Sequence, residues 1–247
     1  MIDTHAHLTA LDDADEAIER AAEAGVTRIL TVGTDVEDCR RALSLAEQHD
    51  GVFAILGIHP HEAGTAGEND LAELRELLAH PKAVAVGETG LDWYRDHAPR
   101  DDQRSLFAGQ LELAAELGKP AVIHTRAADD GTLAGLEGFT GTVVLHCFSS
   151  PHMLPTAFER GWYVSFAGNA TFPKAVDLRL AASQVPAERV FAETDSPYLA
   201  PQPVRGKRNE PANVVHTLAV LARARAEEPA ELERQIERNA AECFGLS

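Results

Sequence analysis

Short apolar runs alternate with amphipathic segments along the whole chain, a pattern typical of strands that alternate with helices. The predicted strands are rich in β-branched residues and almost continuously apolar, as parallel strands covered on both faces should be. Strands are expected at residues 1–7, 26–33, 52–59, 83–87, 121–124, 143–147, 163–166 and 190–193. Helices are expected at residues 13–24, 37–49, 71–79, 101–117, 130–136, 151–160, 174–183, 210–226 and 230–243.

Eight such units in 247 residues predict an α/β protein with one domain, residues 1–247, and the (β/α)8 TIM-barrel fold. No linker or break in composition divides the chain. An open, doubly wound sheet is the alternative for alternating strands and helices. The number eight favours the barrel, and so do the polar residues at nearly every strand end, because those ends meet at one mouth in a barrel.

The composition is that of an ordinary globular protein, with 45% hydrophobic and 25% charged residues. No apolar stretch is long enough to cross a membrane, and residues 1–8 lack the pattern of a secretory signal. The three cysteines are scattered and form no C-x-x-C motif, which fits a reducing compartment. We therefore expect a cytoplasmic protein without membrane contact; its oligomeric state is open, with a monomer favoured.

Six histidine and carboxylate side chains lie at the ends of predicted strands. His5 and His7 end the first strand, and the two-residue period of a strand directs both imidazoles to one side. The other four residues lie at or just after the ends of later strands: Glu88, His124, His146 and Asp195. Such ligands suit divalent zinc, manganese or related ions. Six ligands exceed the need of one hydrolytic ion, so we predict two divalent ions (Mg, Mn or Zn), with Glu88 as the natural bridge.

Seven motifs support a family resemblance. In chain order they are DTHAH (3–7), GIHP (57–60), GETGLD (87–92), HTR (124–126), HCFS (146–149), ETDSPYL (193–199) and RGKRNEP (205–211). With these motifs the chain resembles, over essentially its whole length, the TatD family of metal-dependent deoxyribonucleases, within the amidohydrolase-like barrels. Ser150 stands where the family usually has glycine, and residues 167–169 also depart from the usual run, but neither departure removes a ligand.

The resemblance implies a role for each residue of the site. It assigns the ligands His5, His7 and Asp195 to one metal ion. It assigns His124 and His146 to the other ion, with Glu88 shared between the two. It also implies that His59 faces the scissile phosphate and that Asp195 takes the proton of the attacking water. The expected catalytic residues are thus Glu88, Asp195 and His59. A purely structural role for His59 stays open, because a histidine before proline is common in loops. Glu193 is expected to support the ligands from behind.

Several residues beyond the strand ends suit a phosphate-containing substrate. Arg95 and Arg126 could donate charged hydrogen bonds to phosphate, although solvated surface arginines are equally consistent with the sequence. Trp93 and Tyr94 could provide a wall on which bases stack, with a core-capping role favoured for Trp93. Histidines without a strand-end position, including His61 and His97, are expected to be ordinary surface or loop residues.

The net charge of −17 argues against a globally basic nucleic-acid binder. Residues 200–211 are a local exception, because they contain three cations and one acid: Arg205, Lys207, Arg208 and Glu210. We expect these cations to contact substrate. Only 4 of the 22 basic residues are lysine, so the acidity suggests adaptation to a salty cytoplasm; a bias in codon usage is the alternative. Strong salt screens long-range fields, so the net charge reflects the solvent more than the substrate.

The expected activity is hydrolysis of phosphodiester bonds in DNA, from the 3′ end of single strands, by a water that two metal ions activate. An ester or amide hydrolase, such as a deacylase of mischarged aminoacyl-tRNA, fits the same fold and metals. A metal-binding scaffold without catalysis is the third hypothesis.

Overall fold

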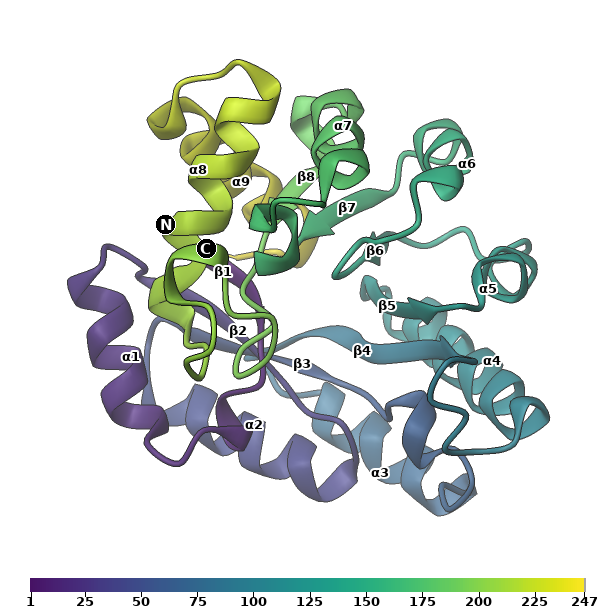
Figure 1. The fold of residues 1–247 in the computed structure, drawn as a ribbon. Coiled ribbons are helices and arrows are strands. Elements are labelled where there is room, and N and C mark those ends of the chain that lie inside the picture. Colours follow the sequence, from purple (N-terminus) through teal and green to yellow (C-terminus); the bar gives the residue numbers. More distant parts are fainter. Residues whose placement is uncertain (247) are drawn as a thin grey trace. The chain divides into compact units, whose positions relative to one another are not determined.

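The computed structural model of the protein describes residues 1–246 and contains eight strands, each followed by helical structure (Figure 1). The strands are β1 (Ile2–Ala6), β2 (Arg28–Val32), β3 (Val52–Leu56), β4 (Ala83–Asp92), β5 (Ala121–Arg126), β6 (Val143–Leu145), β7 (Tyr163–Phe166) and β8 (Val190–Ala192). They belong to one sheet in the order β1 to β8. This order and the alternation with helices confirm the predicted (β/α)8 fold class.

The helices agree with the predicted ones to within a few residues. They are α1 (Ala14–Glu23), α2 (Val36–Gln48), α3 (Glu68–Leu78), α4 (Arg100–Leu117), α5 (Asp129–Gly135), α6 (Leu154–Glu159), α7 (Val176–Gln184), α8 (Val214–Arg225) and α9 (Pro229–Phe244). Short 3-10 turns lie in several of the loops, among them η1 (Leu8–Ala10), η4 (Gly168–Thr171) and η6 (Gln202–Val204). Among residues 1–246, no helix combines the length and apolar character needed to cross a membrane.

Internal contacts divide the chain into two compact units, which we describe separately. Unit 1 consists of residues 1–31 and the chain from residue 146 onward; unit 2 consists of residues 32–145. The single domain expected from the sequence stays a prediction.

In unit 1, β1 pairs with β2 and β7 pairs with β8, both in parallel. The ends of β1 and β8 also lie side by side, because the N–H of Asp195 donates to the carbonyl of His5 (2.9 Å) and the N–H of His7 donates to that of Ser196 (2.7 Å). Helix α9 packs against both strands. The first and last strands therefore bring histidines and a carboxylate to one place.

In unit 2, β3, β4, β5 and β6 form consecutive parallel pairs, with α2, α3 and α4 along one side of β3 to β5 (Figure 1). Strand β4 runs to Asp92, five residues beyond the predicted end. Gly87 and Gly90 have φ angles of +154° and +141°, and a Cβ at Gly90 would lie 2.0 Å from the carbonyl oxygen of His124. Glycine thus lets β4 continue close to β5. Glu88 consequently lies inside its strand, not after it as predicted.

Candidate metal centres

Unit 1 contains four of the predicted ligands, which we call the unit 1 ligand group: His5, His7, His146 and Asp195. His5 lies in β1, and the others follow β1, β6 and β8. One ligand atom each of His5, His146 and Asp195 lies within 4.8 Å of the other two, so that these residues could hold one metal ion. This grouping differs from the division that the resemblance implied, in which His146 belonged to the set of His124. The imidazoles of His5 and His146 are stacked with centroids 3.9 Å apart, and that of His7 meets His5 edge-on at 5.1 Å.

Asp195 is the anionic member of this group. Its Oδ1 lies 3.4 Å from Nε2 of His7 and 4.0 Å from Nε2 of His5. Burial would raise the pKa of Asp195, but the hydrogen bond to His7 and the nearby imidazoles outweigh burial and lower it. The carboxylate is therefore ionised at neutral pH, the state in which it can hold a cation.

Buried polar residues fix the unit 1 ligand group from behind. Oε1 of Glu193 lies 3.2 Å from Nδ1 of His146 and accepts the N–H of Cys147 at 2.7 Å. The hydroxyl of Ser165 donates to the other carboxylate oxygen of Glu193. This contact orients the His146 ring, as partners of metal-binding histidines do, and it confirms the supporting position predicted for Glu193.

Asp3 fastens β1 to the loop that carries Asp195. Its carboxylate accepts the N–H of Thr194 at 2.9 Å and the hydroxyl of Thr194 at 2.5 Å. Complete burial raises the pKa of Asp3 to about 8, although the hydrogen bonds from Thr194 oppose the shift.

Unit 2 contains another group of possible ligands, which we call the unit 2 ligand group and which includes His59, not expected to be a ligand: His59, Glu88 and His124. One ligand atom of each lies within 4.8 Å of the other two. Oε1 of Glu88 lies 2.5 Å from Nδ1 of His124 and 3.5 Å from Nε2 of His59. Burial lowers the pKa of His59 to about 4, with Glu88 opposing the shift, so this imidazole is neutral at physiological pH.

Asp92, a residue to which the sequence analysis assigned no role, adjoins the unit 2 ligand group. Its Oδ2 lies 3.3 Å from Nε2 of His124 and 2.9 Å from Nε2 of His61. Its Oδ1 accepts the N–H groups of residues 94 and 95 at 3.0 and 2.8 Å. Burial would raise the pKa of Asp92, but these hydrogen bonds outweigh it and lower the pKa. Asp92 therefore ties the loop after β4 to a predicted ligand.

His61 and His97 are not the isolated loop histidines that we expected. Their rings stack with centroids 4.5 Å apart, and the ring of His61 also meets that of His59 at 4.2 Å. Two patterns in the sequence could have indicated the positions of His61 and Asp92 beside the predicted ligands. His59 and His61 repeat the H-x-H spacing of His5 and His7, and Asp92 shares the strand parity of Glu88.

One predicted substrate residue of unit 2, Arg126, lies over an exposed aromatic ring. The guanidinium of Arg126 lies 4.2 Å from the ring centre of Tyr94, whose side chain is 65% exposed. Arg95 is exposed on the same loop. Trp93 packs against Gly131, where a Cβ would lie 2.4 Å from the indole, in keeping with the core-capping role that the sequence favoured.

The three cations of residues 200–211 are all exposed, but they differ in their partners. Arg208 donates hydrogen bonds to the carboxylate of Asp12 and to the carbonyl of Ala10. The guanidinium of Arg205 instead lies 3.8 Å from the ring centre of Phe172. Among residues 1–246, no carboxylate forms an ion pair with Arg205 or Lys207. Arg205 and Lys207 are thus more available to an anionic ligand than Arg208.

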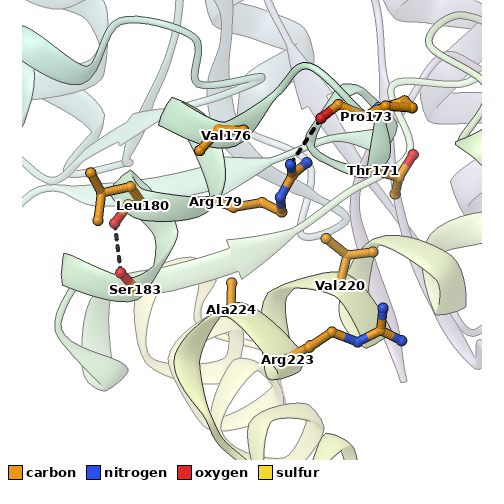
Figure 2. A pocket seen from close by; sticks show the side chains of 9 residues that line it. All are labelled: Thr171, Pro173, Val176, Arg179, Leu180, Ser183, Val220, Arg223 and Ala224. Atoms are coloured by element: carbon orange, nitrogen blue, oxygen red, sulfur yellow. Dashed lines mark hydrogen bonds between the residues drawn. The ribbon is translucent and has the colours of Figure 1, made fainter.

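Unit 1 also contains a groove of about 600 Å³ between α7 and α8 (Figure 2). Its apolar wall includes Val176, Leu180 and Val220, and two arginines, Arg179 and Arg223, also line it. None of the predicted ligands contributes to its lining. The groove is therefore separate from the unit 1 ligand group.

A (β/α)8 fold whose strands carry histidine and carboxylate donors is typical of metal-dependent hydrolases. The family described as TatD related DNase matches residues 2–245 of this chain. The chain belongs to this family, and it is a metal-dependent hydrolase.

Relatives from other organisms agree with this assignment. "Uncharacterized metal-dependent hydrolase TatD" of Mycobacterium tuberculosis is 41% identical over all of this chain and 98% of that protein. "3'-5' ssDNA/RNA exonuclease TatD" of Cronobacter sakazakii is 36% identical over 94% of this chain and 92% of that protein. The crystal structure of YJJV, a TatD homologue from Escherichia coli K12, has a TM-score of 0.94 and 30% identity, and it covers this whole chain and 98% of that one.

The donor sets of both groups fit the metal dependence of the family. Imidazole nitrogens and carboxylate oxygens are ligands for zinc, manganese and related divalent ions. Each group gathers three donors closely enough for one ion. The number of ions, the sharing of Glu88 and the meeting of both groups at one mouth stay predictions, as do the cytoplasmic location and the adaptation to salt.

Proposed function

We propose that this protein hydrolyses phosphodiester bonds of single-stranded DNA from the 3′ end, with one divalent ion at each ligand group. The observation that carries the proposal is that relatives covering more than nine-tenths of this chain bear the name 3'-5' ssDNA/RNA exonuclease. The two ligand groups support it, because two-metal sites are common among nucleases.

In this proposal the chain's own residues orient the reactants. Divalent ions, when bound, would lower the pKa of a water and offset the charge of the phosphate. His5, His7, His146 and Asp195 would hold one ion; Glu88 and His124 would hold the other, with Glu88 shared. Asp195 would accept the proton of the attacking water.

The remaining residues would bind the strand. The neutral imidazole of His59 can donate one hydrogen bond to a phosphate oxygen, because its pKa lies well below neutrality. Arg95, Arg126, Arg205, Lys207 and Arg208 would contact the backbone phosphates as charged donors. Arg208 would first have to release Asp12.

A cleavage panel tests the proposal. Purified protein is incubated with 5′-labelled single-stranded DNA, duplex DNA, RNA and an aminoacyl ester, in high KCl with Mg²⁺, Mn²⁺ or Zn²⁺. We expect a ladder that shortens from the 3′ end of the single strand and that disappears with a chelator. Asp195→Asn should abolish the ladder, whereas Asp177→Asn, an exposed aspartate of α7, should leave it intact. Intact DNA together with hydrolysis of the aminoacyl ester would overturn the proposal and favour the deacylase.

A further inference from the structure

A large aromatic side chain lies exposed beside the unit 1 ligand group. Tyr198, in the loop after β8, is 58% exposed, and its ring meets that of His7 at 5.8 Å with an interplanar angle of 70°. An exposed aromatic face beside a predicted ligand offers a surface on which a flat group of a ligand can stack. Its contact with a predicted ligand places the ring where the substrate must approach.

The backbone on both sides of this ring is held firmly. The N–H of Tyr198 donates to the carbonyl of Asp195 at 2.9 Å, and its carbonyl accepts Nδ2 of Asn209 at 2.7 Å. Asn209 is buried and also donates to the carbonyl of Thr194 at 3.0 Å. Because the loop is fixed before a ligand arrives, little ordering entropy remains to be lost when a flat group stacks on the ring.

The same loop holds an available cation. Arg205 is flattened against Phe172 and is exposed, and it forms no ion pair with a carboxylate among residues 1–246. The segment that carries Phe172 is braced against the loop, because Thr171 Oγ1 accepts the N–H of Gln202 at 2.8 Å. The loop therefore presents an aromatic face and a positioned guanidinium, the two elements with which proteins bind single strands.

We propose that Tyr198 and Arg205 form a nucleotide subsite, in which the ring stacks on an unpaired base next to the reacting ester and the guanidinium binds a backbone phosphate. This inference rests on the proposed function. It also gives a reason for selectivity, because a base inside a duplex has both faces covered by its neighbours. Only an unpaired nucleotide can offer a free face to the ring.

Base stacking contributes enough to be measured. Stacking of one base on an aromatic side chain corresponds to about a 5- to 150-fold change in affinity. Tyr198→Ala should raise KM for single-stranded DNA by this factor and leave kcat nearly unchanged, whereas Tyr198→Phe should behave as the wild type. The control is Leu180→Ala, which removes a side chain of matched exposure (57%) from the groove of Figure 2.

Two further readouts separate stacking from a structural role. On a strand with an abasic site at the terminal nucleotide, wild type and Tyr198→Ala should have equal KM. In the absence of metal, binding of the wild type should quench the fluorescence of a strand that ends in 2-aminopurine. Binding of Tyr198→Ala should not quench it. The inference would be overturned if the wild type and Tyr198→Ala had equal KM on normal DNA. It would also be overturned if Tyr198→Ala raised KM by the same factor on normal and abasic strands. A wild type that cleaves no DNA would instead overturn the proposed function.

Arg205 is tested by the salt dependence of binding. Arg205→Gln should reduce the slope of log affinity against log salt by about 0.7, the value for one phosphate contact on a single strand. Arg223→Gln, an exposed arginine of the separate groove, should leave the slope unchanged. Equal slopes for Arg205→Gln and the wild type would remove Arg205 from the subsite.

Discussion

The two ligand groups use the same donor types but hold them in different ways. In unit 1, the imidazole of His146 contacts a carboxylate, Glu193, which is itself fixed by a backbone N–H and by Ser165. In unit 2, the imidazole of His124 contacts a predicted ligand instead, since Oε1 of Glu88 lies 2.5 Å from its Nδ1. Asp92 adds a second carboxylate at the other nitrogen of His124.

The two groups share one property of metal binding and differ in the support of their histidines. An imidazole binds a metal ion through a nitrogen that carries no proton, so metal binding at either group weakens as the pH falls. The carboxylate that supports His146, Glu193, is not itself a predicted ligand. Unit 1 thus supports His146 with a carboxylate outside the predicted ligands, whereas His124 in unit 2 contacts a predicted ligand, Glu88, as well as Asp92.

The largest expected effect on activity comes from replacing Glu88, the carboxylate that contacts the other predicted ligand of unit 2. Glu88→Gln keeps the shape of the side chain but removes its charge, so activity should fall by about 10²- to 10⁴-fold while the fold is retained. Glu112→Gln, an exposed glutamate of α4, is the matched control. Activity is measured on labelled single strands and folding by circular dichroism. Full activity of Glu88→Gln would mean that the unit 2 ligand group is not part of the catalytic site.

The next effect separates the two groups by their supporting carboxylates. Glu193→Gln and Asp92→Asn should each weaken the binding of one metal ion by about 10- to 100-fold. Titration calorimetry with Mn²⁺ should detect a different weakened site in each variant. If both substitutions weakened the same binding event, the division into two groups would be wrong.

A smaller effect is expected from the histidine behind Asp92. His61→Ala should lower activity by less than about tenfold, because the backbone N–H groups of residues 94 and 95 still orient Asp92. His216→Ala, a half-buried histidine of α8, should leave kcat/KM unchanged. A loss as large as that of Glu88→Gln would place His61 among the ligands.

The smallest effect distinguishes the units by the pH dependence of metal-free stability. In unit 1, folding raises the pKa of Asp3 to about 8, so its contribution to stability is present below the unfolded pKa and is lost as pH rises through about 8. In unit 2, folding lowers the pKa of His59 to about 4, so its contribution is lost as pH falls from 6.5 through about 4. In chemical denaturation between about pH 4 and 8, Asp3→Asn should remove a loss of stability that accompanies rising pH, and His59→Gln should remove a loss that accompanies falling pH below 6.5. Profiles that coincide with the wild type would contradict these assignments.

The sequence predicted most of the fold, because each strand is a short apolar run that a glycine, proline or polar residue ends. Its main error was the end of β4. The pattern there stops at Gly87, but Gly90 permits a close approach to His124 that continues the pairing to Asp92. Such an approach depends on the neighbouring strand, which periodicity along one strand does not report.

The ligands could be predicted for the same reason, because each lies near the end of a strand or just after it, except Glu88, which lies inside β4. His5, His146 and Asp195 come together in the structure, whereas the resemblance placed His146 with His124. Asp92, His61 and His97 were missed because their roles depend on side chains that meet across loops. Tyr198 was missed because only the structure reports that its ring is exposed beside His7.

Anomalous diffraction from crystals soaked in Mn²⁺ tests the central claim most directly, namely that each unit holds a divalent ion. The account predicts one peak among His5, His146 and Asp195, a second peak at Glu88 and His124, and loss of the first peak in Asp195→Asn. The absence of a peak at either group, with ordered Mn²⁺ elsewhere in the molecule, would contradict the account.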